Sequence, residues 1–256
     1  MKNWFISDLH IKDINERNGN ILLRFFFWLN ENPKEHTVYF LGDIFDFWLS
    51  DGQAFQRHYK QLIDEIKKFK TAGGKLIYFE GNHDFHIDRF WTRKIGVEVI
   101  EDEAFFDIDG LKVRAEHGDY INPDDTAYIA YRERVRQPYL EWIAHVTPGA
   151  FWKWVGETMS ARSRKKSVHY TIANEEKIRT MIQAYAMKLY NAEPFDLLVT
   201  GHMHVFDDYS FTGKNKQTVR SINLGTWLKE PLGLLIEQGQ IKIVNIEDIL
   251  NKKKFI

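Results

Sequence analysis

Short apolar runs recur along the chain, and polar residues follow each of them. Seven runs are rich in β-branched and aromatic residues, which predicts strands: Asn3–Ser7, Thr37–Leu41, Lys75–Glu80, Leu111–Glu116, Leu197–Thr200, Val219–Asn223 and Gly233–Glu237. Between some of them, apolar residues recur at helical spacing, in Asn20–Asn30 and in Phe55–Lys70, which stops before Gly73 and Gly74. This alternation of strands and helices in the first half predicts an α/β fold.

Two segments add antiparallel pairs to this pattern. The stretches AFFDIDGLKVRAEHGD and GLLIEQGQIKIVNI each read as a hairpin. A mixed sheet, or two stacked sheets flanked by helices, therefore fits better than one parallel sheet.

A helical segment interrupts the strands between residues 122 and 193. The helices predicted from its periodicity are Ala127–Arg136, Leu140–Val146, Ala150–Met159 and Glu175–Tyr190, with Asn174 as the N-cap of the last. Because no linker-like composition divides the chain, we expect one domain, 1–256, with a helical cap insertion over 122–193.

Composition excludes several kinds of chemistry. The 256 residues include no cysteine, which removes disulfides, thiolate metal sites and cysteine nucleophiles. The net charge of −1 gives no overall attraction to nucleic acid, so no nucleic-acid partner is expected. The chain begins in a strand and has no apolar run long enough to span a bilayer, so we expect a cytoplasmic protein.

Five polar motifs share one placement, because each follows a predicted strand. They are Asp8-Leu-His10, Gly42-Asp43, Gly81-Asn82-His83-Asp84, His117-Gly118-Asp119 and Gly201-His202-Met203-His204. Loops at the carboxyl ends of strands converge on one edge of an α/β sheet. Alone, each motif is often an ordinary turn or an exposed loop, but the five together favour a single site.

Oxygen and nitrogen donors dominate these motifs. Seven of them could bind two divalent metal ions that share a carboxylate: Asp8, His10, Asp43, Asn82, His117, His202 and His204. This donor set suits Mn²⁺, Fe²⁺ or Zn²⁺. Two such ions about 3.5–4 Å apart hold a hydroxide and bind a phosphoryl group for in-line displacement.

The five motifs, in this order, resemble the signature of calcineurin-like metallophosphoesterases. The resemblance implies a four-layer α/β/β/α sandwich with a dinuclear site. By position, Asp8, His10 and His204 would bind one metal ion, and Asn82, His117 and His202 the other, with Asp43 bridging. It also implies that His83 is the catalytic histidine and that Asp84, behind it, orients the imidazole.

Three longer stretches resemble UDP-2,3-diacylglucosamine pyrophosphohydrolases: GDIFDFWLSD, HGDYINPDDTAYIAYRERVRQP and MSARSRKKS. That family cleaves a UDP-linked diacyl sugar to UMP and a sugar 1-phosphate at the cytoplasmic face of the inner membrane, in lipid A synthesis. The resemblance implies substrate-binding roles for Asp125, Tyr128, Arg132, Ser160, Arg162, Ser163, Arg164 and Lys166. The chain departs from the best-known branch of that family at His83, where the branch has arginine.

Alternatives remain for the parts that would recognise a lipid. The basic cluster Arg162–Lys166 could bind phosphates or form a solvated helix face, and the aromatic residues around Trp152 could line an acyl groove or pack the insertion. The run LLRFFFWL could touch the bilayer or lie buried against the sheet. A phosphoesterase with another phosphodiester, nucleotide or lipid substrate is the main rival, and a non-enzymatic scaffold is a third possibility.

Overall fold

The computed structural model describes residues 1–137, 139–140, 142–143, 147 and 174–252. One sheet has six strands, in the order β13 (Gln240–Asn245), β12 (Leu232–Glu237), β1 (Lys2–Ile6), β2 (His36–Leu41), β4 (Lys75–Phe79) and β6 (Glu98–Ile100). Strands β1, β2, β4 and β6 run parallel, while β12 and β13 add an antiparallel edge.

The second sheet has five strands, in the order β10 (Phe206–Thr212), β11 (Thr218–Leu224), β9 (Leu197–Thr200), β8 (Leu111–Glu116) and β7 (Glu103–Ile108). Its centre is parallel, because β9 pairs in parallel with both β8 and β11. A short parallel ribbon joins β3 (Trp48–Leu49) to β5 (Asp84–Phe85).

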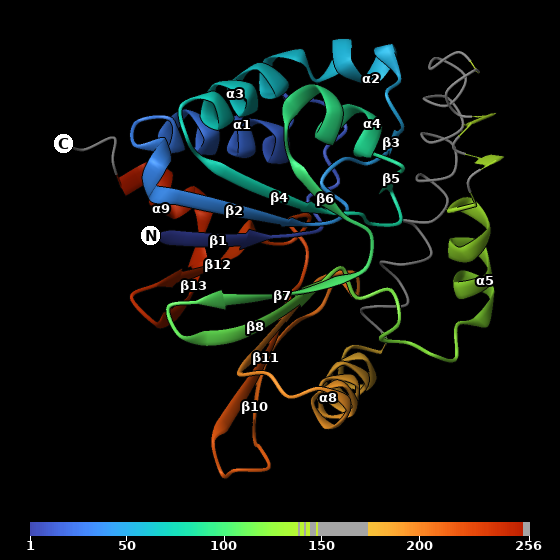
Figure 1. Ribbon diagram of the computed structural model, residues 1–256, viewed down its shortest axis with the longest axis vertical. Coiled ribbons are helices and arrows are strands. Elements are labelled where there is room, and N and C mark those ends of the chain that lie inside the picture. The colour runs from blue at the N-terminus through green and yellow to red at the C-terminus, as the bar shows by residue number, and fades with distance from the viewer. Residues whose placement is uncertain (138, 141, 144–146, 148–173, 253–256) are drawn as a thin grey trace.

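The two sheets stack face to face and helices cover both outer faces (Figure 1). Helices α1 (Arg17–Leu29) and α3 (Lys60–Thr71) pack on the first sheet through side chains such as Phe26 and Phe69. Phe79 of the first sheet and Leu197 of the second belong to the core between the sheets. Helix α8 (Glu175–Ala192) lies on the other face of the second sheet. The expected four-layer α/β/β/α sandwich is confirmed.

Periodicity located most elements to within a residue or two, but the helix predicted over Phe55–Lys70 is divided. It forms α2 (Gln53–His58) and α3, separated at Tyr59. The Tyr59 hydroxyl donates to the carbonyl oxygen of Ile11, and its ring lies 4.5 Å from that of Phe45. These tertiary contacts explain why the backbone departs from the helix at this residue.

Strand β10 was missed because its pattern is polar. Its buried position is Asp207, whose carboxylate receives hydrogen bonds from Arg179 and Gln183 of α8. A buried carboxylate with helical partners gives no apolar alternation to detect.

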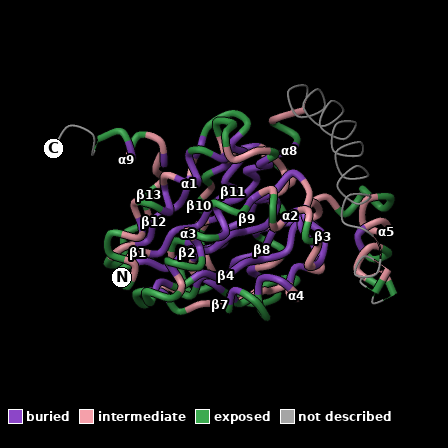
Figure 2. The backbone as a smooth tube through the Cα atoms, turned by 90° about the horizontal axis from the view of Figure 1, so that it is seen from above, coloured by how far each residue is buried: buried purple, intermediate pink, exposed green. Residues whose placement is uncertain are grey.

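The remaining described elements are short. They are the turn Pro33–Glu35, α4 (Asp88–Phe90), the helical turn η2 (Trp91–Ile95), α5 (Thr126–Val135) and α9 (Ile246–Lys252). Figure 2 shows that buried backbone is concentrated in the two sheets, whereas α5 lies at the margin of the molecule. Arg132 is the buried residue of α5. Among the described residues, no helix is long and apolar enough to cross a membrane.

The insertion begins with α5 and ends with α8, which agrees with the helices predicted over Ala127–Arg136 and Glu175–Tyr190. Of the other two helices, Leu140–Val146 lies partly and Ala150–Met159 wholly outside the described residues. The run LLRFFFWL lies in α1, where most of its side chains are buried against the first sheet and Phe27 is 44% exposed. Burial in the core is therefore the correct interpretation of that run.

Candidate metal centre

The five polar motifs meet at one edge of the sandwich, where β3 and β5 lie (Figure 1). In the first sheet, Ile6 pairs with Phe40 and Leu41 with Phe79, so β1, β2 and β4 end side by side. Backbone hydrogen bonds then tie the loops together, from Asp8 N–H to the Gly42 carbonyl and from Gly201 N–H to the His117 carbonyl. The sheets thus bring together residues almost 200 positions apart in the sequence.

One group of ligand atoms contains Asp8, His10, Asp43 and His204, each within 4.8 Å of the others. His10 Nε2 lies 3.0 Å from His204 Nε2, and His204 Nε2 lies 3.1 Å from Asp8 Oδ1. His10 Nε2 is 3.8 Å from Asp43 Oδ2. This group corresponds to the donors expected for the first metal position together with the bridging carboxylate, and its role as a metal site stays a prediction.

A second group lies on the other side of Asp43. Asn82 Oδ1 is 3.3 Å from His117 Nε2 and 3.1 Å from His202 Nδ1, and the two ring nitrogens are 3.3 Å apart. His117 Nε2 is 3.8 Å from Asp43 Oδ1. Because Oδ2 of Asp43 faces the first group and Oδ1 faces the second, the carboxylate is oriented to bridge two cations.

These distances match the geometry of a metal site. With metal–ligand bonds of about 2.0–2.2 Å, neighbouring ligand atoms in a tetrahedron or octahedron are about 3.0–3.5 Å apart. Asp8 Oδ1 is buried and, although His204 Nε2 lies 3.1 Å away, no donor meets hydrogen-bond geometry at this oxygen, whereas a buried carboxylate oxygen normally accepts a hydrogen bond. His117 Nδ1 lies 2.7 Å from the Leu41 carbonyl oxygen, which assigns its proton to Nδ1 and directs the Nε2 lone pair at the site. The residues therefore fit two divalent metal ions.

Five of the seven ligands have a left-handed backbone. Asp8, His10, Asp43, His202 and His204 have φ values between 49° and 67°. This region is unfavourable for residues with a side chain and persists where surrounding structure enforces it. Sequence analysis gave no signal for this strain, because left-handed positions are usually recognised by glycine and a metal ligand cannot be glycine.

The charges of the site agree with ligation. Burial alone would raise the pKa of Asp43, but His83, His117 and His10 hold it below its ordinary value. Burial lowers the pKa of His10 to about 3, and burial together with His117 lowers that of His202 to about 4, so both imidazoles are neutral donors. His117 differs: burial opposes protonation, but Asp43, Asp119 and Asp8 raise its pKa to about 9. A divalent cation would take the place of the proton on His117 Nε2.

His83 lies at the rim of the centre. Its Nδ1 is 2.8 Å from the carbonyl oxygen of Asp46, and its Nε2 is 4.0 Å from Asp43 Oδ2. The side chain is 13% exposed, so the ring is not completely buried.

Asp84 does not orient His83, and that prediction is wrong. Its carboxylate is fully buried and accepts hydrogen bonds from the backbone N–H groups of Asp43, Ile44 and Gly81 and from the Tyr78 hydroxyl. Four donors occupy both oxygens, and none of the four belongs to the His83 imidazole. Asp84 instead joins the loop after β2, which carries the bridging ligand, to the loop after β4.

The structure places three of the eight predicted substrate-binding residues. Asp125 caps α5 by accepting from Tyr128 N–H, and the Tyr128 ring lies 4.9 Å from that of His202. Arg132 is only 6% exposed and is held within the protein by Asp119, Asp102 and Tyr120. Its expected role in substrate binding stays a prediction, and these internal partners already occupy its guanidinium group. Ser160, Arg162, Ser163, Arg164 and Lys166 lie outside the described residues.

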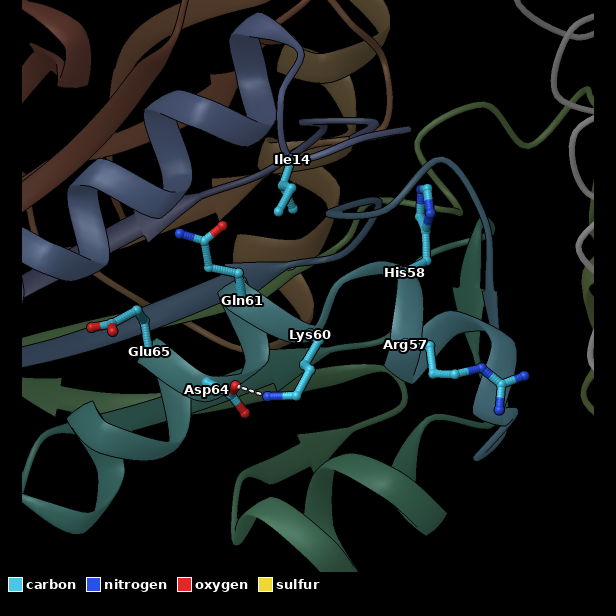
Figure 3. Close-up of a pocket in the computed structure, with 7 residues that line it drawn as sticks. All are labelled: Ile14, Arg57, His58, Lys60, Gln61, Asp64 and Glu65. Atoms are coloured by element: carbon cyan, nitrogen blue, oxygen red, sulfur yellow. Dashed lines mark hydrogen bonds and ion pairs between the residues drawn. The ribbon is translucent and has the colours of Figure 1, made fainter.

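A separate groove of about 460 Å³ lies between the loop after β1 and helices α2 and α3 (Figure 3). Its lining is largely polar: Ile14, Arg57, His58, Lys60, Gln61, Asp64 and Glu65. Lys60 and Asp64 form an ion pair on its wall. None of the predicted site residues lines this groove.

Two stacked sheets with a carboxylate between two groups of nitrogen and oxygen donors are the arrangement expected of a metal-dependent phosphoesterase. The model of the calcineurin-like phosphoesterase family matches residues 1–206, and the chain belongs to that family. It is a metal-dependent hydrolase of phosphoesters.

Curated relatives extend the similarity over nearly the whole chain. A protein of Aliivibrio fischeri (strain MJ11) named UDP-2,3-diacylglucosamine hydrolase is 28% identical over 98% of each chain. One with the same name from Vibrio atlanticus (strain LGP32) is 27% identical over 96% of this chain and 98% of its own. Among solved structures, a novel archaeal phosphodiesterase is 15% identical, with a TM-score of 0.49 over 96% of this chain and 99% of its own.

Proposed function

We propose that the protein hydrolyses the pyrophosphate of UDP-2,3-diacylglucosamine, giving UMP and 2,3-diacylglucosamine 1-phosphate, with Mn²⁺ as the divalent metal ion. The observation that carries this proposal is the end-to-end match, covering 98% of both chains, to a relative named for that substrate. The complete donor set on both sides of Asp43 supports hydrolysis rather than a scaffold role.

The reaction adds water across one phosphoanhydride bond. The water oxygen forms a bond to phosphorus, the bond from that phosphorus to the bridging oxygen breaks, and the leaving phosphate departs as an anion. Two bound cations supply charge neutralisation at the phosphoryl oxygens and make water a better nucleophile near neutral pH. In this proposal Asp43 would help to hold both cations, because Oδ2 lies on the side of His10 and Oδ1 on the side of His117.

His83 has the position of a proton donor or of a stabilising group for the phosphoryl. With Nδ1 donating to the Asp46 carbonyl oxygen, the Nε2 edge of the ring faces the centre beside Asp43. A positioned histidine of this kind contributes to transfer of a proton to a leaving group or to stabilisation of charge on the phosphoryl.

The insertion would bind the lipid part of the substrate. Large apolar side chains near the end of α5 are exposed, with Tyr139 at 57% and Trp142 at 62%. Exposed aromatic side chains of this kind suit acyl chains or a bilayer surface. We therefore include in the proposal peripheral contact with the cytoplasmic face of the inner membrane, and substrate contacts from Asp125, Tyr128, Ser160, Arg162, Ser163, Arg164 and Lys166.

The test compares three substrates with Mn²⁺ present: UDP-2,3-diacylglucosamine in mixed micelles, UDP-N-acetylglucosamine, which lacks the long acyl chains, and bis-p-nitrophenyl phosphate. The proposal expects kcat/KM for the acylated substrate to exceed that for either soluble ester by about 100-fold or more, since acyl burial adds binding free energy. Products are identified by mass spectrometry. Equal or faster hydrolysis of a soluble ester would refute the substrate and leave a phosphoesterase of different specificity.

Three variants localise the activity. Asp8→Ala should abolish hydrolysis of all three substrates, whereas Asp64→Ala, an exposed carboxylate on α3, should leave it unchanged. Arg164→Ala should raise KM for the UDP-lipid more than KM for the small chromogenic ester. Equal changes in the two KM values would remove this part of the insertion from substrate binding.

A further inference from the structure

Helices α5 and α8, at the two ends of the insertion, both form hydrogen bonds to the loop that carries His117. Glu116 precedes this ligand and Asp119 follows it by two positions. Helix α5 binds Asp119 through the Tyr128 hydroxyl and through Arg132 Nε, which lies 2.8 Å from Asp119 Oδ2. Helix α8 binds Glu116 through the Tyr185 hydroxyl, 2.6 Å from Oε1. The two ends of the insertion thus hold opposite sides of one metal-ligand loop.

Glu116 is a buried carboxylate with one donor on each oxygen. Tyr185 donates to Oε1, and Arg114 Nε donates to Oε2 at 2.8 Å. The side chains of Arg114 and Glu116 are only 9% and 8% exposed. Since water has little access, loss of either donor leaves a carboxylate oxygen poorly satisfied, and the segment that carries it must shift.

Apolar packing also connects α8 to the loops that carry His117 and His204. Ile178 and Ile182 of α8 form one buried cluster with Ile121 and Val205. Ile121 follows the loop of His117, and Val205 follows His204 directly. A displacement of α8 would therefore be transmitted to the backbone at both places.

We propose that Tyr185 is a positioning residue for His117, acting through Glu116, so that binding of the second metal ion depends on the docking of α8. This inference rests on the dinuclear centre and is independent of which phosphoester the enzyme cleaves. By reciprocity, filling the second metal position would stabilise the docked α8.

Tyr190 offers a matched control on the same helix. Its ring is buried, and its hydroxyl accepts from Lys214 N–H and from Gln217, both in the turn between β10 and β11. Tyr185→Phe and Tyr190→Phe each remove one hydroxyl that joins α8 to another element. Only the first removes a contact to the His117 loop.

The experiment titrates Mn²⁺ into chelator-treated full-length protein by calorimetry, with the spin-coupled dinuclear EPR signal at two equivalents as a second readout. Wild type and Tyr190→Phe should bind two ions alike. Tyr185→Phe should lower the Mn²⁺ affinity of one position by about fivefold to tenfold and should reduce the coupled EPR signal. This loss is somewhat smaller than that expected when a group hydrogen-bonded directly to a metal ligand is removed. Circular dichroism checks that both variants are folded.

A double variant tests the route through Glu116. If Tyr185 acts by way of that carboxylate, Tyr185→Phe in a Glu116→Leu background, which leaves the hydroxyl no side-chain partner at position 116, should weaken Mn²⁺ binding no further. Equal Mn²⁺ affinities for Tyr185→Phe and Tyr190→Phe would overturn the proposal, as would fully additive losses in the double variant. Because no UDP-lipid is used, these outcomes are distinct from failure of the proposed substrate.

Discussion

Replacing Gly81 by alanine should remove the bridge between the two metal positions. Gly81 lies between β4 and Asn82, and a Cβ there would lie 2.2 Å from Asp43 Oδ1, 2.5 Å from Asp43 N and 2.8 Å from Asp84 Oδ1. Real Cβ contacts are essentially never shorter than 3.0 Å, so the carboxylate oxygen must retreat by at least 0.8 Å, from 2.2 Å to 3.0 Å.

That displacement is large compared with the tolerance of a metal bond. Metal–ligand distances in proteins lie within about 0.2 Å of their standard values, so Asp43 Oδ1 could no longer reach a cation held by His117 and Asn82. Misplacement by about 1 Å in a reacting centre lowers rates about 100-fold. We therefore expect kcat to fall about 100-fold or more, while overpacking lowers the free energy of unfolding by about 1–3 kcal/mol.

The assay combines three measurements on Gly81→Ala: hydrolysis of bis-p-nitrophenyl phosphate, Mn²⁺ stoichiometry by calorimetry, and thermal unfolding. The control is Gly96→Ala, where φ is +76° and a Cβ would meet nothing within 4 Å. Its left-handed backbone should lower stability by about 1–2 kcal/mol and leave kcat unchanged. A Gly81→Ala enzyme that binds two Mn²⁺ ions and keeps half of its kcat would refute the steric reasoning.

Three further results should follow from the same geometry. His83→Gln should lower kcat about 100- to 1000-fold and leave the Mn²⁺ stoichiometry at two, because His83 lies beside the centre without being one of its seven donors. An unchanged kcat would exclude a catalytic role for His83. Removal of metal ions by a chelator should lower the midpoint of thermal unfolding. Mn²⁺ at about 100 times its Kd should restore about 2.7 kcal/mol of stability for each ion bound, which scanning fluorimetry would record as a rise of about 5–10 °C. The absence of a shift would mean that folding and metal binding are uncoupled. Arg132→Met should lower the free energy of unfolding in urea by about 3–5 kcal/mol, because Asp119 is left buried without its cation; a loss under 1 kcal/mol would contradict this ion-pair assignment.

Local pattern was sufficient for most of the secondary structure. The strands of both sheets that lie between packed layers are apolar and β-branched, so β2, β4, β8 and β9 were predicted to within a residue. The failures have a tertiary cause in each case. Strand β10 buries a carboxylate that pairs with α8, and the helix before Gly73 is interrupted where Tyr59 binds the Ile11 carbonyl oxygen.

The candidate donors were also accessible from sequence, because donor residues after strands can be counted without coordinates. Roles that depend on the direction in which a side chain points were not accessible from the sequence. Asp84 is adjacent in sequence to His83, yet its carboxylate turns inward to three backbone amides and a tyrosine. Arg132 belongs to a motif that implied substrate binding, yet it lies buried against Asp119.

The sequence by itself determined which residues could bind metal ions and, through the order of the motifs, the class of hydrolase. Only the tertiary structure decided how those residues act. It divides the two oxygens of Asp43 between two donor groups, forces five ligands into left-handed backbone, and joins Tyr185 of the insertion to the His117 loop. The physical reason is that donor identity is a property of single residues, whereas orientation, strain and coupling arise from contacts between segments far apart in the chain.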